Sequence, residues 1–288
     1  MKISVSSYSF DQYIRSGKIT QLDTVKLAWE LGFEGVEFTD LSGKTLDEQK
    51  EYAKKIKKEA EKYGLEIVAY CIGARLFSES DEECAKEVER VKGQVDVAEI
   101  LGAKVLRHDI CYSEKIGNKV VSFGKMLPTI AKNAREITEY AQKKGIRTAT
   151  ENHGYIAQDS DRVEALYNAV DHENYGLLID IGNFACADED SVRAVSRLAP
   201  YAIHVHAKDF HIRSFGEAPY KENAYFESRG GNYLTGTSVG EGDVNAAQCI
   251  HIIKKSGYDG FVTIEYEGYE DCIVGIKKGM ENLKGYLK

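Results

Sequence analysis

The chain is organised around one stretch, Tyr201-Ala202-Ile203-His204-Val205-His206-Ala207-Lys208-Asp209. Apolar and polar residues alternate in its first half, which is typical of a half-buried β-strand. Successive side chains of a strand point to opposite faces, so His204 and His206 lie on the same side. Because the alternation ends in the charged pair Lys208-Asp209, we expect this strand to carry polar chemistry at its C-terminal end.

Three other apolar stretches also end in a carboxylate. They are residues 148–154 with Glu151, residues 177–183 with Asp180, and residues 262–268 with Glu265. With His206, they place one imidazole and three carboxylates at the tips of four different predicted strands. Nitrogen and oxygen ligands of this kind hold divalent cations in proteins. The sequence therefore predicts a metal site at these strand ends.

Apolar runs alternate with amphipathic helices along the whole chain. The predicted strands are residues 3–7, 35–38, 65–70 and 104–107, and four more that end at Glu151, Asp180, His206 and Glu265. The predicted helices are residues 22–31, 46–63, a helix between Ser80 and Gly102, and residues 123–144, 161–170, 190–198, 244–256 and 271–287. In the helix at 46–63, Thr45 and Glu48 form a capping-box pair and Gly64 follows the last turn. The pattern amounts to eight strand–helix units.

Strands that alternate with helices predict a parallel sheet with right-handed crossovers. Eight such units in 288 residues favour a single (β/α)8 TIM barrel that spans residues 1–288. An open doubly wound sheet is the alternative. It is disfavoured because no G-x-G-x-x-G follows the first strand and because the candidate ligands sit on four strands rather than at one switch point.

The composition argues against several classes of protein. A formal net charge of −8 disfavours binding to a nucleic-acid backbone, since such proteins usually carry a basic face. No apolar run reaches the length of a membrane span. The six cysteines show no C-x-x-C spacing and the N-terminus has no apolar secretory segment. We therefore expect reduced thiols, a cytoplasmic location and no membrane partner.

Five short motifs occur in order along the chain: Glu151-Asn152-His153-Gly154, Asp180-Ile181-Gly182-Asn183, His206-Ala207-Lys208-Asp209, Gly240-Glu241-Gly242-Asp243 and Glu265-Tyr266-Glu267-Gly268. Together they resemble the sugar phosphate isomerase/epimerase family of xylose isomerase-like TIM barrels. That family includes ketose 3-epimerases, hydroxypyruvate isomerases, inosose dehydratases and nucleases of the endonuclease IV type. The resemblance covers nearly the whole chain and does not name a substrate. Asn183 departs from the ketose epimerases, which tend to have a histidine three residues after the aspartate.

The resemblance implies a cofactor and a reaction. The cofactor is one divalent ion held by Glu151, Asp180, His206 and Glu265, with manganese expected ahead of magnesium, cobalt or zinc. Such an ion polarises a carbonyl group and makes the neighbouring carbon easier to deprotonate. We assign Glu151 and Glu265 as the acid/base pair of a reaction that passes through a cis-enediolate.

Further polar residues near the predicted strand ends are candidates for substrate contacts. His153, two residues after Glu151, is a third candidate catalytic group because an imidazole can move protons near neutral pH. Arg107 ends the fourth strand and is expected to line the barrel mouth, since a buried arginine would otherwise lack a partner. We predict that the substrate also contacts Asn183, Lys208 and Arg213. His204 lies one layer deeper and is expected to support the site rather than to ligate the ion.

Four functions agree with these features. The first is a metal-dependent isomerase or epimerase of a sugar or keto-sugar in carbohydrate metabolism. The second is a lyase similar to inosose dehydratase or acting on a 3-keto-glycoside, because it would share the first proton abstraction. A nuclease of the endonuclease IV type is third and would need more histidines. The fourth is a partner subunit without turnover.

The connection between Asp209 and Asp243 is long and rich in glycine and aromatic residues. Connections of this length in a compact domain are usually functional. We expect this segment to close over the barrel mouth or to contribute to a homo-oligomer contact.

Overall fold

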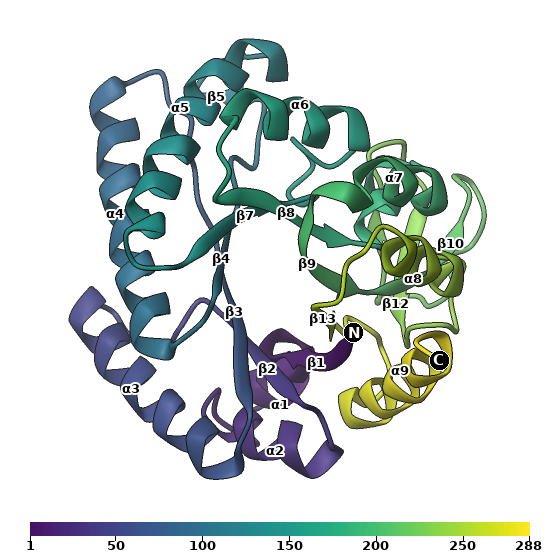
Figure 1. Ribbon diagram of the computed structural model, residues 1–288. Helices are drawn as coiled ribbons and strands as arrows, with labels where there is room; N and C mark the ends of the chain where they lie inside the picture. Colours follow the sequence, from purple (N-terminus) through teal and green to yellow (C-terminus); the bar gives the residue numbers. More distant parts are fainter.

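Eight parallel strands close into a barrel (Figure 1). The computed structural model describes residues 1–288. The barrel strands are β1 (Lys2–Ser6), β2 (Gly35–Thr39), β3 (Glu66–Ile72), β4 (Val105–His108), β7 (Arg147–Glu151), β8 (Tyr175–Asp180), β9 (Ala202–Ala207) and β13 (Phe261–Ile264). They lie around the barrel in chain order, and β13 pairs with β1 to close it. The predicted (β/α)8 fold is confirmed.

A ring of helices covers the outside of the barrel (Figure 1). The helices are α1 (Asp11–Arg15), α2 (Asp23–Leu31), α3 (Leu46–Tyr63), α4 (Asp81–Leu101), α5 (Phe123–Gln142), α6 (Ser160–Val170), α7 (Ser191–Leu198), α8 (Ala246–Lys255) and α9 (Cys272–Tyr286). Short 3-10 turns lie at η1 (Ser7–Phe10), η2 (Asn183–Ala187) and η3 (Ala199–Tyr201). Because each long helix returns the chain to the start of the next strand, the C-terminal ends of all eight strands lie on the same face of the barrel.

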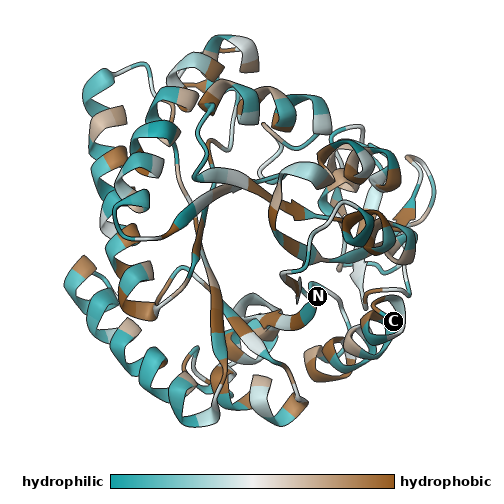
Figure 2. Ribbon diagram, in the orientation of Figure 1, coloured by the Kyte–Doolittle hydropathy of each residue, from teal (hydrophilic) through white to brown (hydrophobic).

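Helix α3 shows how local sequence sets these boundaries. The Oγ1 atom of Thr45 accepts the N–H of Glu48 at 3.2 Å, and the Glu48 carboxylate accepts the N–H of Thr45. At the other end Gly64 takes a left-handed conformation with φ +67°. Ile56 and Ala60 lie on the buried face between these ends. Figure 2 shows apolar residues on the barrel strands and polar residues along much of the helical ring.

The long connection after β9 contains a small sheet of its own. Its strands β10 (Asp209–Arg213), β11 (Phe226–Glu227) and β12 (Tyr233–Thr237) pair antiparallel in the order β10-β12-β11. The buried side chains of Phe210 and Leu234 give this sheet an apolar side. The sequence predicts this segment only as a long connection, and its three strands are not predicted because they are short.

Asp188 anchors the turn between β11 and β12 to the barrel. Its Oδ1 accepts hydrogen bonds from Ser228 Oγ at 2.5 Å and from Asn232 Nδ2 at 2.8 Å. Its Oδ2 accepts the N–H of Gly230 at 2.6 Å. Since Asp188 directly follows η2, the small sheet is tied to the loop that leaves β8.

All six cysteines are buried and free. None of the helices combines the length and the apolar character that crossing a bilayer requires.

Candidate metal centre

Four side chains meet where four neighbouring barrel strands end. Glu151 ends β7, Asp180 ends β8, His206 lies in β9, and Glu265 directly follows β13. One ligand atom from each lies within 4.8 Å of the others, and all four residues are buried. The Nδ1 atom of His206 lies 3.6 Å from Glu151 Oε1, 3.9 Å from Asp180 Oδ2 and 3.6 Å from Glu265 Oε2. The structure thus brings together all four predicted ligands.

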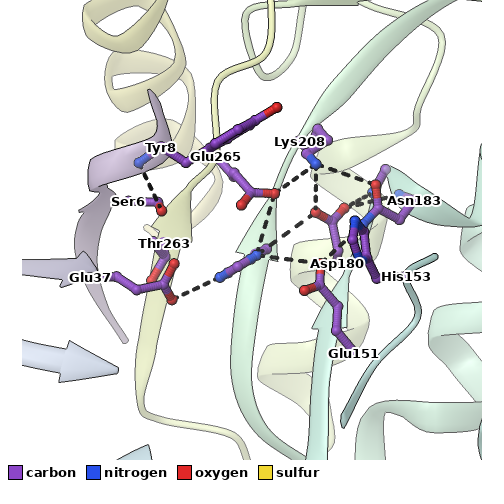
Figure 3. A network of polar contacts seen from close by, with 12 residues as sticks. Ser6, Tyr8, Glu37, Glu151, His153, Asp180, Asn183, Lys208, Thr263 and Glu265 are labelled. Atoms are coloured by element: carbon purple, nitrogen blue, oxygen red, sulfur yellow. Dashed lines mark hydrogen bonds and ion pairs between the residues drawn. The ribbon is translucent and has the colours of Figure 1, made fainter. Parts of the chain in front are cut away.

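Two atoms of this cluster are buried and lack a hydrogen-bond partner: Asp180 Oδ2 and His206 Nδ1. The other oxygen of Asp180 is held, because Oδ1 accepts the N–H groups of Gly182 at 2.7 Å and Asn183 at 2.9 Å. An unpaired buried polar atom is costly, and the two unpaired atoms face one another within the cluster. A divalent cation would satisfy both atoms, so the residues fit the implied metal. Figure 3 shows the carboxylates of Asp180 and Glu265 directed toward this point.

The electrostatics of the cluster favour positive charge. Burial alone would lower the pKa of His206, but the carboxylates of Glu37, Glu265 and Glu151 raise it well above its usual range. Burial, opposed by Lys208 and reinforced by the neighbouring Glu151 and Glu265, raises the pKa of Asp180 to about 6. The three carboxylates lie close together and repel one another unless a positive charge lies between them. A divalent ion would relieve that repulsion.

Glu37 orients the imidazole of His206 by a hydrogen bond. Its Oε2 accepts hydrogen bonds from His206 Nε2 at 2.8 Å and from His204 Nε2 at 2.9 Å. A hydrogen bond on Nε2 leaves Nδ1 as the nitrogen that faces the cluster. His204 also contacts Thr263 Oγ1 at 2.9 Å, so it is a supporting residue as predicted. Glu37, His204 and His206 form a second group of potential ligands, but their facing atoms are already hydrogen-bonded to one another.

Glu151 is held in place by a charged partner on the adjacent strand β4. Arg107 donates from Nε to Glu151 Oε2 at 2.6 Å, and its Nη2 contacts the same oxygen. Although burial would raise the pKa of Glu151, Arg107 and His206 lower it well below its usual range. Asn183 Nδ2 donates to the other oxygen, Oε1, at 3.0 Å. Glu151 is therefore an oriented anion.

His153 forms a pair with Asp109. Its Nδ1 lies 2.9 Å from Asp109 Oδ1, and Tyr112 donates its hydroxyl to Asp109 Oδ2 at 2.8 Å. Burial would lower the pKa of His153, but the charge of Asp109 outweighs it and raises the pKa above the usual value. Because Asp109 holds Nδ1, the second ring nitrogen is the one left for other partners.

Lys208 bridges the acidic residues on the opposite side of the cluster. Its Nζ lies 2.6 Å from Glu265 Oε2, 3.4 Å from Glu267 Oε2 and 3.7 Å from Asp180 Oδ2. Burial alone would lower the pKa of Lys208, but these carboxylates raise it well above its usual range. Tyr8 donates its hydroxyl to Glu267 Oε1 at 2.8 Å, so the lysine and the tyrosine share one carboxylate.

A cavity of about 480 Å³ opens beside this cluster, at the C-terminal ends of the strands. Its volume is within the range usual for small-molecule sites. Among the predicted site residues, the wall includes Arg107, His153, Asn183, Lys208 and Glu265.

One predicted substrate contact lies elsewhere. Arg213 is at the end of β10, outside the cavity wall, with its guanidinium carbon 5.7 Å from the ring centre of Tyr220.

The description of a known family fits this geometry. A family model described as xylose isomerase-like TIM barrel matches residues 25–286. The chain belongs to this family.

Relatives within the xylose isomerase-like family have different names. The chain is 26% identical to an inosose dehydratase of Mesomycoplasma hyopneumoniae strain 7448 over 75% of this chain and 73% of that protein. It is 24% identical to the L-ribulose-5-phosphate 3-epimerase UlaE of Escherichia coli over 92% of this chain and 89% of that protein. A crystal structure of an IOLI protein with a bound zinc atom superposes with a TM-score of 0.76 at 15% identity, covering 100% of this chain and 98% of that one. These xylose isomerase-like relatives include both an epimerase and a dehydratase.

Sequence reasoning misses three acidic residues of this xylose isomerase-like site. Asp40, Asp109 and Glu267 line the cavity but are not predicted as site residues. Asp109 and Glu267 each lie two residues beyond a predicted site residue, Arg107 and Glu265. That spacing is the signal that could have found them, since each follows the end of a barrel strand and so reaches the mouth.

Proposed function

We propose that the protein is a divalent-metal-dependent isomerase or epimerase of a sugar or keto-sugar. The observation that carries the proposal is the buried cluster of Glu151, Asp180, His206 and Glu265, in which two facing atoms lack partners. The epimerase among the relatives supports the same class of reaction. The adjoining cavity has room for a small polar substrate.

A divalent ion in the cluster would supply Lewis-acid polarisation of a substrate carbonyl. The chain's own contribution is proton transfer. Glu151 and Glu265 both have pKa values lowered by their cationic neighbours despite burial, so both are anionic, which is the form that a proton acceptor must have. They come from strands on either side of β9. One carboxylate removes the proton beside the carbonyl to give an enediolate, and the other returns it.

Arg107 and Lys208 orient these two carboxylates. Arg107 engages the Oε2 atom of Glu151, which leaves Oε1 toward the cluster. Lys208 contacts the Oε2 atom of Glu265 at 2.6 Å. A fixed carboxylate holds its proton-accepting oxygen in one position, which keeps the transfer distance short.

A lyase is the second candidate, and one observation favours it. His153 lines the cavity with its Nδ1 held by Asp109, an arrangement suited to a single general base. Elimination needs one base and an acid that assists the leaving group. An epimerase instead needs two proton-transferring groups on opposite faces of the substrate carbon. The inosose dehydratase among the relatives supports this alternative.

The test is metal analysis followed by exchange in deuterated water. The purified protein, loaded with manganese or magnesium, is incubated with ketoses, keto-inositols and 3-keto-glycosides. We expect one divalent ion per chain and deuterium in a substrate carbon, detected by mass spectrometry. A stereoisomer as product indicates an epimerase, a positional carbonyl isomer an isomerase, and an unsaturated product a lyase. Absence of exchange with every class of substrate at full metal loading would contradict the proposal.

A further inference from the structure

The charge of the cavity beside the metal centre is predominantly negative. Its wall includes four carboxylates, two basic side chains and one imidazole, namely Asp40, Asp109, Glu265, Glu267, Arg107, Lys208 and His153. The cluster adds the carboxylates of Glu151 and Asp180. Even with a divalent ion bound and His153 protonated, the six carboxylates outnumber the three cationic side chains and the two charges of the ion together. An anionic group of a substrate that entered this space would be repelled by the excess of negative charge.

Neither Arg107 nor Lys208 is free to bind an anion. Arg107 is engaged by Glu151, and its Nη1 lies 3.4 Å from Asp109 Oδ1. Lys208 is engaged by Glu265 and Glu267 and also lies 3.4 Å from Asn183 Oδ1. Both cations are buried and already share their charge between two carboxylates. A phosphate or carboxylate on a substrate would have to displace those contacts.

One of the two backbone loops that often bind phosphate in such barrels is also occupied. TIM barrels frequently hold phosphate in the loops after the seventh and eighth strands. Here the glycine loop that follows the seventh strand, β9, wraps around Asp209. Its Oδ2 accepts the N–H groups of Gly240 at 2.8 Å and Gly242 at 3.1 Å. Its Oδ1 accepts the N–H of Val244 at 3.1 Å. The protein's own carboxylate thus fills the anion position.

Uncharged polar groups make up much of the remaining wall. They are Tyr8, Thr39, Tyr112, Tyr155, Gln158 and Asn183. Hydroxyl and amide groups both donate and accept hydrogen bonds, which matches the hydroxyl groups of a polyol.

We infer that the cavity selects an uncharged polyhydroxylated substrate and excludes phosphate esters and sugar acids. The inference rests on the proposed function for its reaction and on the charge balance for its selectivity. It separates this chain from the relative whose name specifies a phosphorylated sugar.

A nearby cation provides a matched reference. Arg75 lies on the far side of Tyr112, with its guanidinium carbon 5.7 Å from the ring centre. It lines a neighbouring cavity of about 450 Å³ and not the one beside the metal centre. If Arg75 were an anion-binding residue of the active site, removing it would weaken binding of a phosphate ester.

The first test compares matched pairs of substrates. Ribulose, xylulose and fructose, each with its terminal phosphate ester, are offered to the magnesium-loaded protein in deuterated water. We expect exchange with a neutral member to exceed that with its ester by about 100-fold in kcat/KM, because like charges in a confined site repel strongly. Arg75→Ala should leave that ratio unchanged. Exchange with an ester at or above the rate of its neutral partner overturns the inference.

The second test does not depend on turnover. Inorganic phosphate is titrated calorimetrically into the magnesium-loaded wild type, the double variant Asp40→Asn/Glu267→Gln, and the control Glu270→Gln, which changes an exposed glutamate of the same loop. We expect the double variant to bind phosphate at least about tenfold more tightly than the other two. Equal phosphate binding by wild type and double variant overturns the inference. If no sugar exchanges deuterium, the proposed function fails, and this titration still decides the charge selectivity.

Discussion

Asp180 and Asp209 are both buried aspartates at the C-terminal face of the barrel, but their hydrogen bonds differ. Both oxygens of Asp209 are paired: Oδ2 with two N–H groups of the glycine loop, and Oδ1 with those of Val244 and Phe210. Asp180 has two N–H partners on Oδ1 and none on Oδ2. The difference teaches that burial alone does not mark a functional residue. Here the two unpaired atoms that face one another, Asp180 Oδ2 and His206 Nδ1, are what point to a bound cation.

The largest expected effect separates the two aspartates by metal binding. Asp180→Ala and His206→Ala each remove an atom that now lacks a partner, so we expect each to weaken binding of divalent ions by more than about 100-fold. Asp209→Ala should retain the ion, because none of its oxygens faces the cluster. Metal content after dialysis, measured by mass spectrometry, checks both. Similar metal loss in Asp180→Ala and Asp209→Ala would remove the distinction.

The second effect concerns the two proposed proton carriers. Glu151→Gln and Glu265→Gln keep one ligating oxygen but lose the basic carboxylate, so turnover should fall by about 10²–10⁴-fold while metal content falls modestly. In an epimerase, each variant should block deuterium entry from a different epimer. In a lyase, only one variant should block it. Near-normal turnover in both would leave His153 as the base to test.

The third effect concerns the free energy of unfolding, for which we expect the larger loss at Asp209 and the smaller loss at Asp180. Asp209→Ala leaves four N–H groups without their acceptor, two of them buried and two part-buried, so we expect the free energy of unfolding to fall by about 2–4 kcal/mol. Metal-free Asp180→Ala should change it by less than about 1 kcal/mol, because the lost hydrogen bonds are offset by relief of repulsion from Glu151 and Glu265. Urea denaturation of the metal-free proteins measures both values. A larger loss for Asp180→Ala would mean that its carboxylate is structural.

The smallest effect is local to the sheet that follows Asp209. Asp188→Ala removes three hydrogen bonds to the turn between β11 and β12, which should raise the rate of proteolysis in residues 209–243 by about tenfold. Global stability and metal content should remain near those of the wild type. Protection equal to the wild type would show that the apolar packing of Phe210 and Leu234 is enough to hold the sheet.

The fold and the clustering of the four candidate ligands were predictable because both follow from where the strands end. Strand ends follow from where an apolar run stops, and a parallel barrel brings all those ends to one face. That rule alone brings Glu151, Asp180, His206 and Glu265 together.

Contacts across the barrel were not predictable in the same way. Glu37 bonds to His206 across a separation of 169 residues, and its partner depends on how the two strands lie within the closed barrel. The pairing of Asp109 with His153 likewise depends on how the loops after β4 and β7 converge. Arg213 lies outside the cavity because β10 pairs with β12 in the small antiparallel sheet. Hydrophobic periodicity does not encode the direction in which a strand such as β10 runs.

Anomalous X-ray diffraction from crystals of the manganese-loaded protein tests the central claim most directly. The account predicts one peak per chain, within about 2.0–2.3 Å of Asp180 Oδ2, His206 Nδ1 and the facing oxygens of Glu151 and Glu265. A peak beside Asp209, a peak between Glu37 and His204, or no peak at the four-residue cluster would contradict it.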